Sequence, residues 1–449
     1  MVRWFMKPPV VCREVRRESS CAGGPHHPAK SRCGANGLAG SLVLGIIVFG
    51  ACRSHSLVAR SDGGTEAGLA CSAGYAPLVT YATGSDSRPH SVLAADLDGD
   101  GYPDLAWVGS TSTNRTDIPS LGVLLNRGDG TFSDQVVYST SPSGALVVAD
   151  LNGDSLLDLA ALQPVSSSIG VFFNKGKGTF AGPVVYETGD PLHDSAIGLA
   201  VGDVNGDRVP DLVVAHFVYA LDSTRYLVEV FLNAGDGTLA AVPDPLDTGD
   251  FAPEWIAVGD LNGDGVGDLV ALHSGSPAEI GVFLASGGGA FSNPIVVNGG
   301  SCTSTSNIAM GDLDGDGRPD LAFFCDNQLR VFLNRGGPQI LAGAVSYPGS
   351  PTVPVTANSQ PTAPSAAVGN LSSDGYLDIA ITDGVSSTIG LFLNRGDGTF
   401  IGPTVVTTDS GSVLGTVAIA DLDGNGASDI VTTNTDSNTI GVLLAGCLP

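Results

Sequence analysis

A short acidic loop recurs seven times in this chain, and its oxygen-bearing side chains are spaced to bind a metal ion. The first copy runs from Asp96 to Asp104, and the others start at Asp150, Asp203, Asp260, Asp312, Asn370 and Asp421. The consensus is Asp-x-[Asp/Asn]-Gly-[Asp/Asn]-x-x-x-Asp. Side chains at positions 1, 3, 5 and 9 and the backbone carbonyl of position 7 form the kind of oxygen shell that Ca²⁺ prefers. Because no His or Cys recurs in the loop, the pattern favours Ca²⁺ over zinc.

Six of the loops have Asp or Asn at all four positions, with Asp at positions 1 and 9, and we expect about six structural calcium sites. The expected ligands, with position 7 contributing its carbonyl, are Asp96, Asp98, Asp100, Tyr102 and Asp104; Asp150, Asn152, Asp154, Leu156 and Asp158; Asp203, Asn205, Asp207, Val209 and Asp211; Asp260, Asn262, Asp264, Val266 and Asp268; Asp312, Asp314, Asp316, Arg318 and Asp320; and Asp421, Asp423, Asn425, Ala427 and Asp429. The loop that starts at Asn370 keeps only the carboxylates of Asp374 and Asp378, so we expect it to be weak or empty. The alternative is that the aspartates only cap turns, but six aligned copies argue against it.

The loops recur at steps of 51 to 58 residues, which indicates an array of similar supersecondary units. The first unit has four apolar segments, at Val92–Ala95, Leu105–Val108, Leu121–Asn126 and Thr131–Ser139. These segments are too short for helices. In the second and third segments both the odd and the even positions are apolar, which predicts strands that are covered on both faces. The Gly-rich stretch Asn126–Phe132 predicts a hairpin turn. Seven four-stranded antiparallel units predict an all-β, seven-bladed propeller.

The chain ends support a closed ring. The seventh unit stops after its third strand, and the segment Tyr75–Tyr81 matches the fourth-strand sequence Phe180–Tyr186. An N-terminal strand that completes the last blade removes an unpaired edge. We therefore assign residues 75–449 to the propeller.

Residues 1–52 have the features of an export signal. Basic residues are frequent in residues 1–37, and Leu38–Ala51 is a run of 14 mostly apolar residues, which is short for a membrane span. Phe49-Gly50-Ala51-Cys52 resembles a lipobox, in which Cys52 would be acylated. A lipoprotein, a plainly cleaved signal and an uncleaved anchor all remain open. Each places the domain outside the cell or at its surface, on a flexible tether of residues 53–74.

Export affects the interpretation of the cysteines. Cys71, Cys302, Cys325 and Cys447 remain after the leader, and an oxidising compartment favours their pairing. Four cysteines allow three connectivities, and the register of the repeats selects Cys71–Cys447 and Cys302–Cys325.

The strong negative charge is explained largely by the loops. The net charge is −26, and 22 of the 46 acidic residues lie at the side-chain ligand positions of the seven loops. Bound cations would cancel much of this charge. A nucleic-acid partner, which needs a basic surface, is not expected.

The loop Asp260–Asp268 and the Asn394–Phe400 type of turn together resemble the FG-GAP repeat family, also known as VCBS-type repeats. The resemblance covers residues 75–448. This segment is also similar to the seven-bladed N-terminal propeller of integrin α chains. It implies extracellular, calcium-dependent binding or adhesion to a protein or glycan. Integrin-style ligand recognition is not carried over, because the partner domains are absent.

Because successive strands of a blade run in opposite directions, the loops between strands 1 and 2 and the turns between strands 3 and 4 lie on the same face of the ring. The opposite face receives connections of irregular length, at Gly109–Ser120, Phe217–Tyr226, Gly249–Trp255 and Pro348–Pro364. Variable loops on a rigid scaffold are a common place for recognition. The aromatic residues of this face, which either stack on a ligand or pack between blades, are Tyr219, Tyr226 and Trp255.

Two further interpretations are weaker. Arg127-Gly128-Asp129 and Arg395-Gly396-Asp397 spell a tripeptide that integrins recognise, but both lie inside the repeated turn, and we attribute them to the turn consensus. No catalytic motif is recognised, so we expect a non-catalytic module. The alternatives are a polysaccharide-directed lyase or hydrolase and a purely structural envelope protein.

Overall fold

The computed structural model describes the chain from Gly74 to Gly446 with short gaps. The described residues are 74–85, 87–113, 116–139, 144–163, 167–189, 194–219, 224–248, 253–273, 275–302, 305–337, 340–349, 364–408 and 413–446. The expected leader and nearly all of the tether lie outside these residues, as do six of the eight cysteines (Cys12, Cys21, Cys33, Cys52, Cys71 and Cys447). Within them, no helix is long and apolar enough to cross a membrane.

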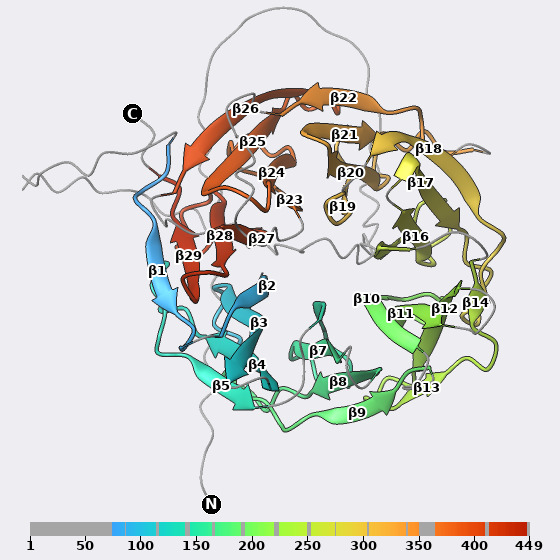
Figure 1. Cartoon of the computed structure of the whole chain (residues 1–449), viewed down its shortest axis with the longest axis horizontal. Coiled ribbons are helices and arrows are strands. Elements are labelled where there is room, and N and C mark those ends of the chain that lie inside the picture. The colour runs from blue at the N-terminus through green and yellow to red at the C-terminus, as the bar shows by residue number, and fades with distance from the viewer. Residues whose placement is uncertain are drawn as a thin grey trace, which may run out of the picture. The chain divides into compact units, whose positions relative to one another are not determined.

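The described chain is all β and forms seven antiparallel sheets arranged as blades in a ring (Figure 1). Blade 1 is β2 (Pro89–Ala95), β3 (Asp104–Thr113), β4 (Thr116–Leu124) and β5 (Val136–Ser139). Blade 2 is β6 (Leu146–Ala149), β7 (Asp158–Gln163), β8 (Ser168–Phe172) and β9 (Val184–Glu187). Blade 3 is β10 (Asp194–Gly202), β11 (Asp211–Tyr219), β12 (Thr224–Asn233) and β13 (Leu239–Ala241), with β14 (Leu246–Asp247) also paired to β12. Blade 4 is β15 (Trp255–Gly259), β16 (Asp268–His273), β17 (Gly275–Phe283) and β18 (Ile295–Cys302).

The remaining blades complete the circle. Blade 5 is β19 (Ala309–Gly311), β20 (Asp320–Cys325), β21 (Gln328–Phe332) and β22 (Val345–Pro348). Blade 6 is β23 (Ser365–Gly369), β24 (Asp378–Thr382), β25 (Thr388–Asn394) and β26 (Phe400–Thr407). Blade 7 is β27 (Leu414–Ala420), β28 (Asp429–Asn434), β29 (Thr439–Leu443) and β1 (Val79–Ala82).

The predicted closure of the ring is confirmed. β1 pairs with β29 in an antiparallel register that runs from Val79 opposite Val442 to Ala82 opposite Thr439. A further bridge joins Tyr75 to Ala445. In Figure 1 the blue β1 therefore lies beside the red β29, so that both ends of the described chain share one sheet.

The hydrophobic core lies between the blades. Seven clusters of buried side chains are present, and each joins two neighbouring blades. Leu105 and Trp107 of β3 face blade 7, whereas Ala106 and Val108 face blade 2. All four side chains are fully buried. The second strand of a blade is apolar at odd and even positions because neighbouring blades cover both of its faces.

The large side chains between blades require small residues opposite them. Gly122 of β4 pairs with Trp107, and a Cβ atom at Gly122 would lie 2.2 Å from the indole nitrogen. The absence of a side chain at Gly122 lets the tryptophan lie flat on the sheet, where it fills the space between blades 1 and 7.

Candidate metal centre

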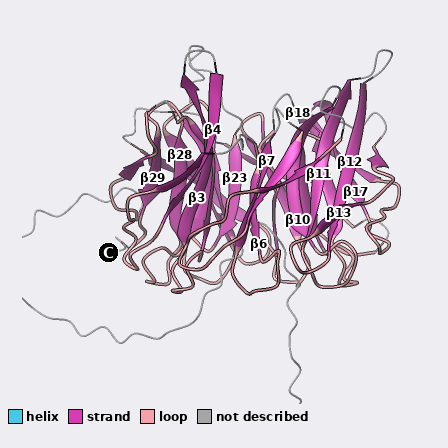
Figure 2. Ribbon diagram, turned by 90° about the horizontal axis from the view of Figure 1, so that it is seen from below, coloured by secondary structure: helices cyan, strands magenta, loops and turns pink. Residues whose placement is uncertain are grey.

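We number the acidic loops 1 to 7 by blade; each joins the first strand of its blade to the second. The turns between the third and fourth strands lie on the same face of the ring, since side chains of these turns hydrogen-bond to the acidic loops of neighbouring blades. Figure 2 shows loops along the lower edge of the ring and β4, β12 and β18 toward the upper edge. This arrangement agrees with the prediction that the acidic loops and the turns between strands 3 and 4 share one face, with the other connections on the opposite face.

The position-1 carboxylate organises each of the six complete loops. In loop 1, Asp96 Oδ1 accepts the N–H groups of Gly99 (2.7 Å) and Asp100 (3.1 Å), and Oδ2 accepts that of Gly101 (2.9 Å). Asp98 and Asp100 each accept the N–H group two residues further along. Corresponding bonds to position 1 occur at Asp150, Asp203, Asp260, Asp312 and Asp421. The chain therefore curls around its own carboxylates.

Three loops bring three carboxylates close together. Ligand oxygens lie within 4.8 Å of one another in the sets Asp96, Asp98 and Asp104; Asp312, Asp314 and Asp316; and Asp421, Asp423 and Asp429. Calcium–oxygen distances of 2.3–2.6 Å allow two ligands of one ion to be at most about 5 Å apart. In each of these three loops the N–H group of position 5 donates to the carboxylates of both position 1 and position 3, so shared hydrogen bonds contribute to the convergence. The oxygens are also spaced as ligands of one ion would be. The donor sets therefore fit a hard divalent cation.

Loops 2, 3 and 4 carry Asn at position 3, and these residues hold the same curled conformation. The Oδ1 atoms of Asn152, Asn205 and Asn262 accept the N–H group of position 5 at 2.9, 2.8 and 2.8 Å. In loops 3 and 4 the amide also donates to the position-5 carboxylate, at 2.9 Å in both. The position-3 oxygens thus stay on the inside of the loop, where a ligand is expected.

Loop 5 differs because two arginines contact its carboxylates. Arg335 Nη1 lies 2.7 Å from Asp314 Oδ2, and Arg318 Nη1 lies 3.1 Å from Asp316 Oδ2. Both arginine side chains are about half exposed. Their charge offsets part of the repulsion among the carboxylates of this loop.

The position-9 aspartate connects its loop to the rest of the blade. Asp104 is fully buried; its Oδ2 accepts the N–H group of Leu97 (2.9 Å), and its Oδ1 accepts that of Asn126 (2.7 Å). The equivalent pair of bonds occurs at Asp158, Asp211, Asp268, Asp320 and Asp429. The sequence predicted a ligand at this position, and the structure adds a hydrogen-bonding role within the blade.

Burial raises the pKa of these position-9 carboxyls, although the backbone donors lower it in part and neighbouring carboxylates raise it further. The pKa reaches about 7 for Asp104, Asp211 and Asp429 and about 6 for Asp158, Asp268 and Asp320. A nearby positive charge would favour the ionised form of each group.

Loop 6 has a different arrangement. Asp378 Oδ2 accepts both the N–H group (2.8 Å) and the hydroxyl (2.9 Å) of Ser372, while Leu371 N–H donates to Gly369 instead. The Oδ1 atom of Asn370, at position 1, is buried without a hydrogen-bond partner. The loop therefore satisfies its position-9 carboxylate with its own serine.

Five asparagines next to the acidic loops have a role that the sequence analysis did not predict. In five blades an Asn stands at the end of the third strand or just after it, and each of these asparagines joins two blades. Asn174 Nδ2 donates to Leu97 O of blade 1 (2.7 Å) and to Leu157 O of blade 2 (2.9 Å), and its Oδ1 accepts Gly176 N–H. Asn126, Asn233, Asn334 and Asn394 make the same three contacts. The recurrence of Asn at the start of the predicted hairpin turn is the sequence feature that marks these residues.

The Arg-Gly-Asp tripeptides belong to this turn. Asp129 accepts the N–H group (3.0 Å) and hydroxyl (2.6 Å) of Thr131, and Asp397 makes the same bonds to Thr399 at 2.9 and 2.5 Å. These bonds lower the pKa of both carboxyls. Both aspartates thus have the role in the turn that the repeat consensus implies.

On the opposite face, two segments interpreted as loops are largely strand. β3 and β4 pair as far as Thr113 opposite Thr116, and β11 and β12 as far as Tyr219 opposite Thr224. Tyr226 packs edge-on against Phe217, with ring centroids 5.2 Å apart, and Trp255 packs against the cluster between blades 4 and 5. These two aromatic residues therefore pack within the protein. Most of Pro348–Pro364 lies outside the described residues, as do the side chain of Tyr219 and residues 249–252 of Gly249–Trp255.

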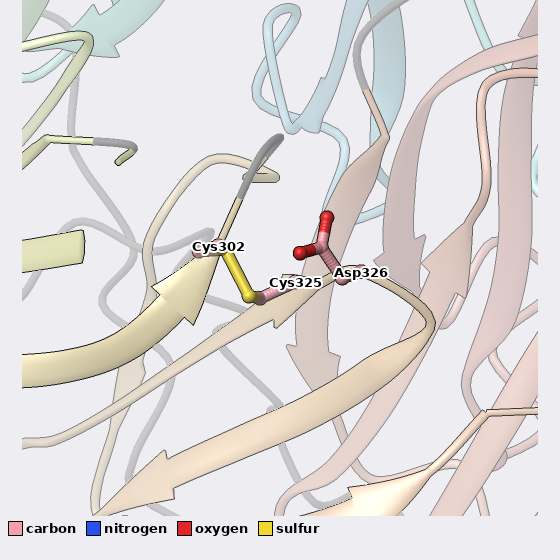
Figure 3. Close-up of side chains that lie close together, drawn as sticks. All are labelled: Cys302, Cys325 and Asp326. Atoms are coloured by element: carbon pink, nitrogen blue, oxygen red, sulfur yellow. A yellow bond between two sulfur atoms is a disulfide. The ribbon is translucent and has the colours of Figure 1, made fainter. Parts of the chain in front are cut away.

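Of the two predicted disulfides, Cys302–Cys325 is present in the structure (Figure 3). It joins the end of β18 in blade 4 to the end of β20 in blade 5, and both cysteines are fully buried. The carboxylate of Asp326 lies beside the two sulfur atoms. The pair Cys71–Cys447 cannot be placed, because both residues lie outside the described part of the chain.

Comparison with solved structures finds chains that are similar to this one at low sequence identity. A lectin of Agrocybe aegerita, described as recognising non-reducing terminal N-acetylglucosamine, is 21% identical over 72% of this chain and 81% of its own, with a TM-score of 0.48. The structure of BBS1N in complex with ARL6DN is 13% identical over 84% of this chain and 98% of its own, with a TM-score of 0.51. No curated protein matches the sequence.

A family model described as FG-GAP-like repeat matches this chain six times in succession. The matches cover residues 96–161, 150–214, 217–271, 268–323, 312–381 and 370–432, and so extend across all seven acidic loops. Taken with the seven blades and the recurrent loops, these matches show that the chain belongs to the FG-GAP-like repeat family.

Proposed function

We propose that the protein is an exported, calcium-binding propeller that acts as a non-catalytic binding or adhesion module for a protein or glycan at the cell surface. The observation that carries the calcium part is the convergence of three carboxylates in each of loops 1, 5 and 7, with oxygens within 4.8 Å of one another. The family membership agrees with a binding scaffold.

In each complete loop the cation would be held by the side chains of positions 1, 3, 5 and 9 and by the carbonyl of position 7. A cation supplies positive charge that offsets the mutual repulsion of these carboxylates and favours their ionised form. The chain contributes the curled backbone that aims the oxygens inward, through the N–H bonds to position 1. The site is therefore structural: it fixes the conformation of the loop face.

The opposite face is the better candidate for ligand recognition. There the β3–β4 and β11–β12 hairpins extend beyond the length of their counterparts in blades 2 and 5, where β7 and β20 have 6 residues each. The loop face carries an acidic loop of the same length in every blade, whereas the connections on the opposite face differ in length from blade to blade. Differences on a rigid scaffold are a common source of specificity.

Export and surface attachment are supported by the sequence of residues 1–52 and belong to the same proposal. The apolar run before Cys52 and the lipobox-like sequence favour a lipid anchor, with a cleaved signal as the alternative. Metabolic labelling with a fatty acid tests this: label on the wild-type protein and none on C52A supports the anchor, and an unlabelled wild-type protein contradicts it.

A ligand screen of the purified protein tests the binding function. We expect a glycan or extracellular protein to bind in calcium, to be released by chelation, and to remain chemically unchanged. Formation of a shortened or unsaturated saccharide would instead favour a polysaccharide-directed hydrolase or lyase. A protein that binds no partner but is incorporated into envelope material would favour the structural alternative.

A further inference from the structure

The five asparagines form hydrogen-bonded links between the acidic loops of successive blades. Leu97 donates its N–H to Asp104 of loop 1 and accepts the side-chain amide of Asn174. The backbone N–H of Asn174 in turn donates to Asp158 of loop 2. The position-9 carboxylates of loops 1 and 2 are thus connected through two residues and three hydrogen bonds.

The same connection repeats along two runs of blades. The first run joins loops 7, 1, 2 and 3 through Asp429, Leu422, Asn126, Asp104, Leu97, Asn174, Asp158, Leu151, Asn233 and Asp211. The second joins loops 4, 5 and 6 through Asp268, Leu261, Asn334, Asp320, Leu313, Asn394 and Asp378.

Alanine interrupts this connection at two boundaries. Ala285 in blade 4 and Ala445 in blade 7 keep the backbone bond to their own position-9 carboxylate, at 2.8 and 2.6 Å, but have no side-chain amide to reach the preceding blade. At the boundary between blades 3 and 4, Gly267 N–H donates to Asp203 O (2.7 Å) instead. This bond joins the backbones of loops 3 and 4 directly, but no side-chain amide takes part in it and it reaches neither position-9 carboxylate.

We propose that the asparagines are positioning residues that divide the ring into two cooperative arcs for divalent-cation binding, one of loops 7, 1, 2 and 3 and one of loops 4 and 5. The inference rests on the proposed calcium-binding function. A cation that fixes Asp104 also fixes Leu97, whose carbonyl then holds the amide of Asn174 in place for loop 2. Loop 6 ends the second arc, because Ser372 satisfies its position-9 carboxylate.

Calcium titration of the full chain by calorimetry tests the arcs, with Asn174→Ala as the interrupting variant. We expect the wild-type protein to bind calcium cooperatively, and N174A to show a Hill coefficient closer to 1 and an affinity at least about five-fold weaker in loops of the first arc. Ala285→Asn, which restores the missing amide, should join the arcs and raise the Hill coefficient.

A matched control is Asn307→Ala. Asn307 also joins two blades, through Ala366 N–H (2.7 Å) and Ala366 O (3.0 Å), but it precedes β19 at the end of the strand remote from loop 5. N307A should lower the melting temperature and leave the shape of the calcium isotherm unchanged. Because A285N removes no contact, it keeps the test valid if N174A fails to fold.

The outcomes separate the two claims. Absence of calcium binding by the wild-type protein would overturn the proposed function and the arcs with it. Binding to independent, equal sites, or an isotherm unchanged in both N174A and A285N, would overturn the arcs alone. A change in N174A matched by an equal change in N307A would assign the effect to general destabilisation and would also overturn the arcs.

Discussion

Loops 1 and 6 join the same two strands of their blades, yet they hold their carboxylates differently. In loop 1, Asp96 accepts three backbone N–H groups, and Asp104 accepts that of Leu97. In loop 6, the Oδ1 atom of Asn370 has no partner, and Asp378 accepts two bonds from Ser372. Both position-9 aspartates still accept the N–H group of the Asn at or just after the end of strand 3, Asn126 in blade 1 and Asn394 in blade 6. Both loops thus keep a hydrogen bond from the end of strand 3 to the position-9 carboxylate, whereas only loop 1 has carboxylates at positions 1 and 3, where we propose a cation.

The largest expected effect is the removal of calcium from all complete loops at once. At a free concentration 100 times the dissociation constant, each site contributes about 2.7 kcal/mol to the free energy of unfolding. Chelation should therefore lower the melting temperature substantially, as measured by calorimetry in calcium and in EDTA. Equal melting temperatures in the two buffers would show that the loops need no cation.

A single-loop comparison comes next. Asp96→Ala removes the position-1 ligand of loop 1 and should lower the calcium stoichiometry by one and the free energy of unfolding in calcium by about 2.7 kcal/mol at the same saturation. Asn370→Ala, at the same position of loop 6, should leave the stoichiometry unchanged. Urea unfolding with and without calcium gives both free energies. If the two variants lost equal amounts of bound calcium, loop 6 would be a site like the others.

The smallest effect is expected from rebuilding loop 6. The double substitution N370D and S372D supplies carboxylates at positions 1 and 3 and removes the serine that satisfies Asp378. We expect one additional calcium ion per chain and a gain in melting temperature that appears only in calcium. No additional ion in a folded double variant would mean that ligand identity alone does not distinguish the two loops.

Much of the fold could be predicted because its determinants are local and repeated. The strand segments and the acidic loops recur in all seven units, the Asn126–Phe132 type of turn recurs in several, and the match of Tyr75–Tyr81 to Phe180–Tyr186 identified the closing strand. The segment Gly109–Ser120 was predicted to be one of the connections of irregular length between the second and third strands. In the structure it is mostly paired strand, because β3 and β4 continue to pair beyond the common length of the blades.

The inter-blade role of the asparagines could not be predicted from sequence alone. The amide of Asn174 bonds to a carbonyl 77 residues away, and that of Asn126 to one 296 residues away. Such contacts depend on the packing of neighbouring blades. The packing of Tyr226 on Phe217 likewise follows from the extended β11–β12 hairpin, which local sequence did not indicate.

Calcium stoichiometry measures the central claim most directly. The protein, stripped of metal and then dialysed against calcium, should retain six ions per chain by atomic emission, one for each of loops 1 to 5 and 7. Retention of no calcium, with the fold intact, would contradict the account and leave the aspartates as turn caps alone.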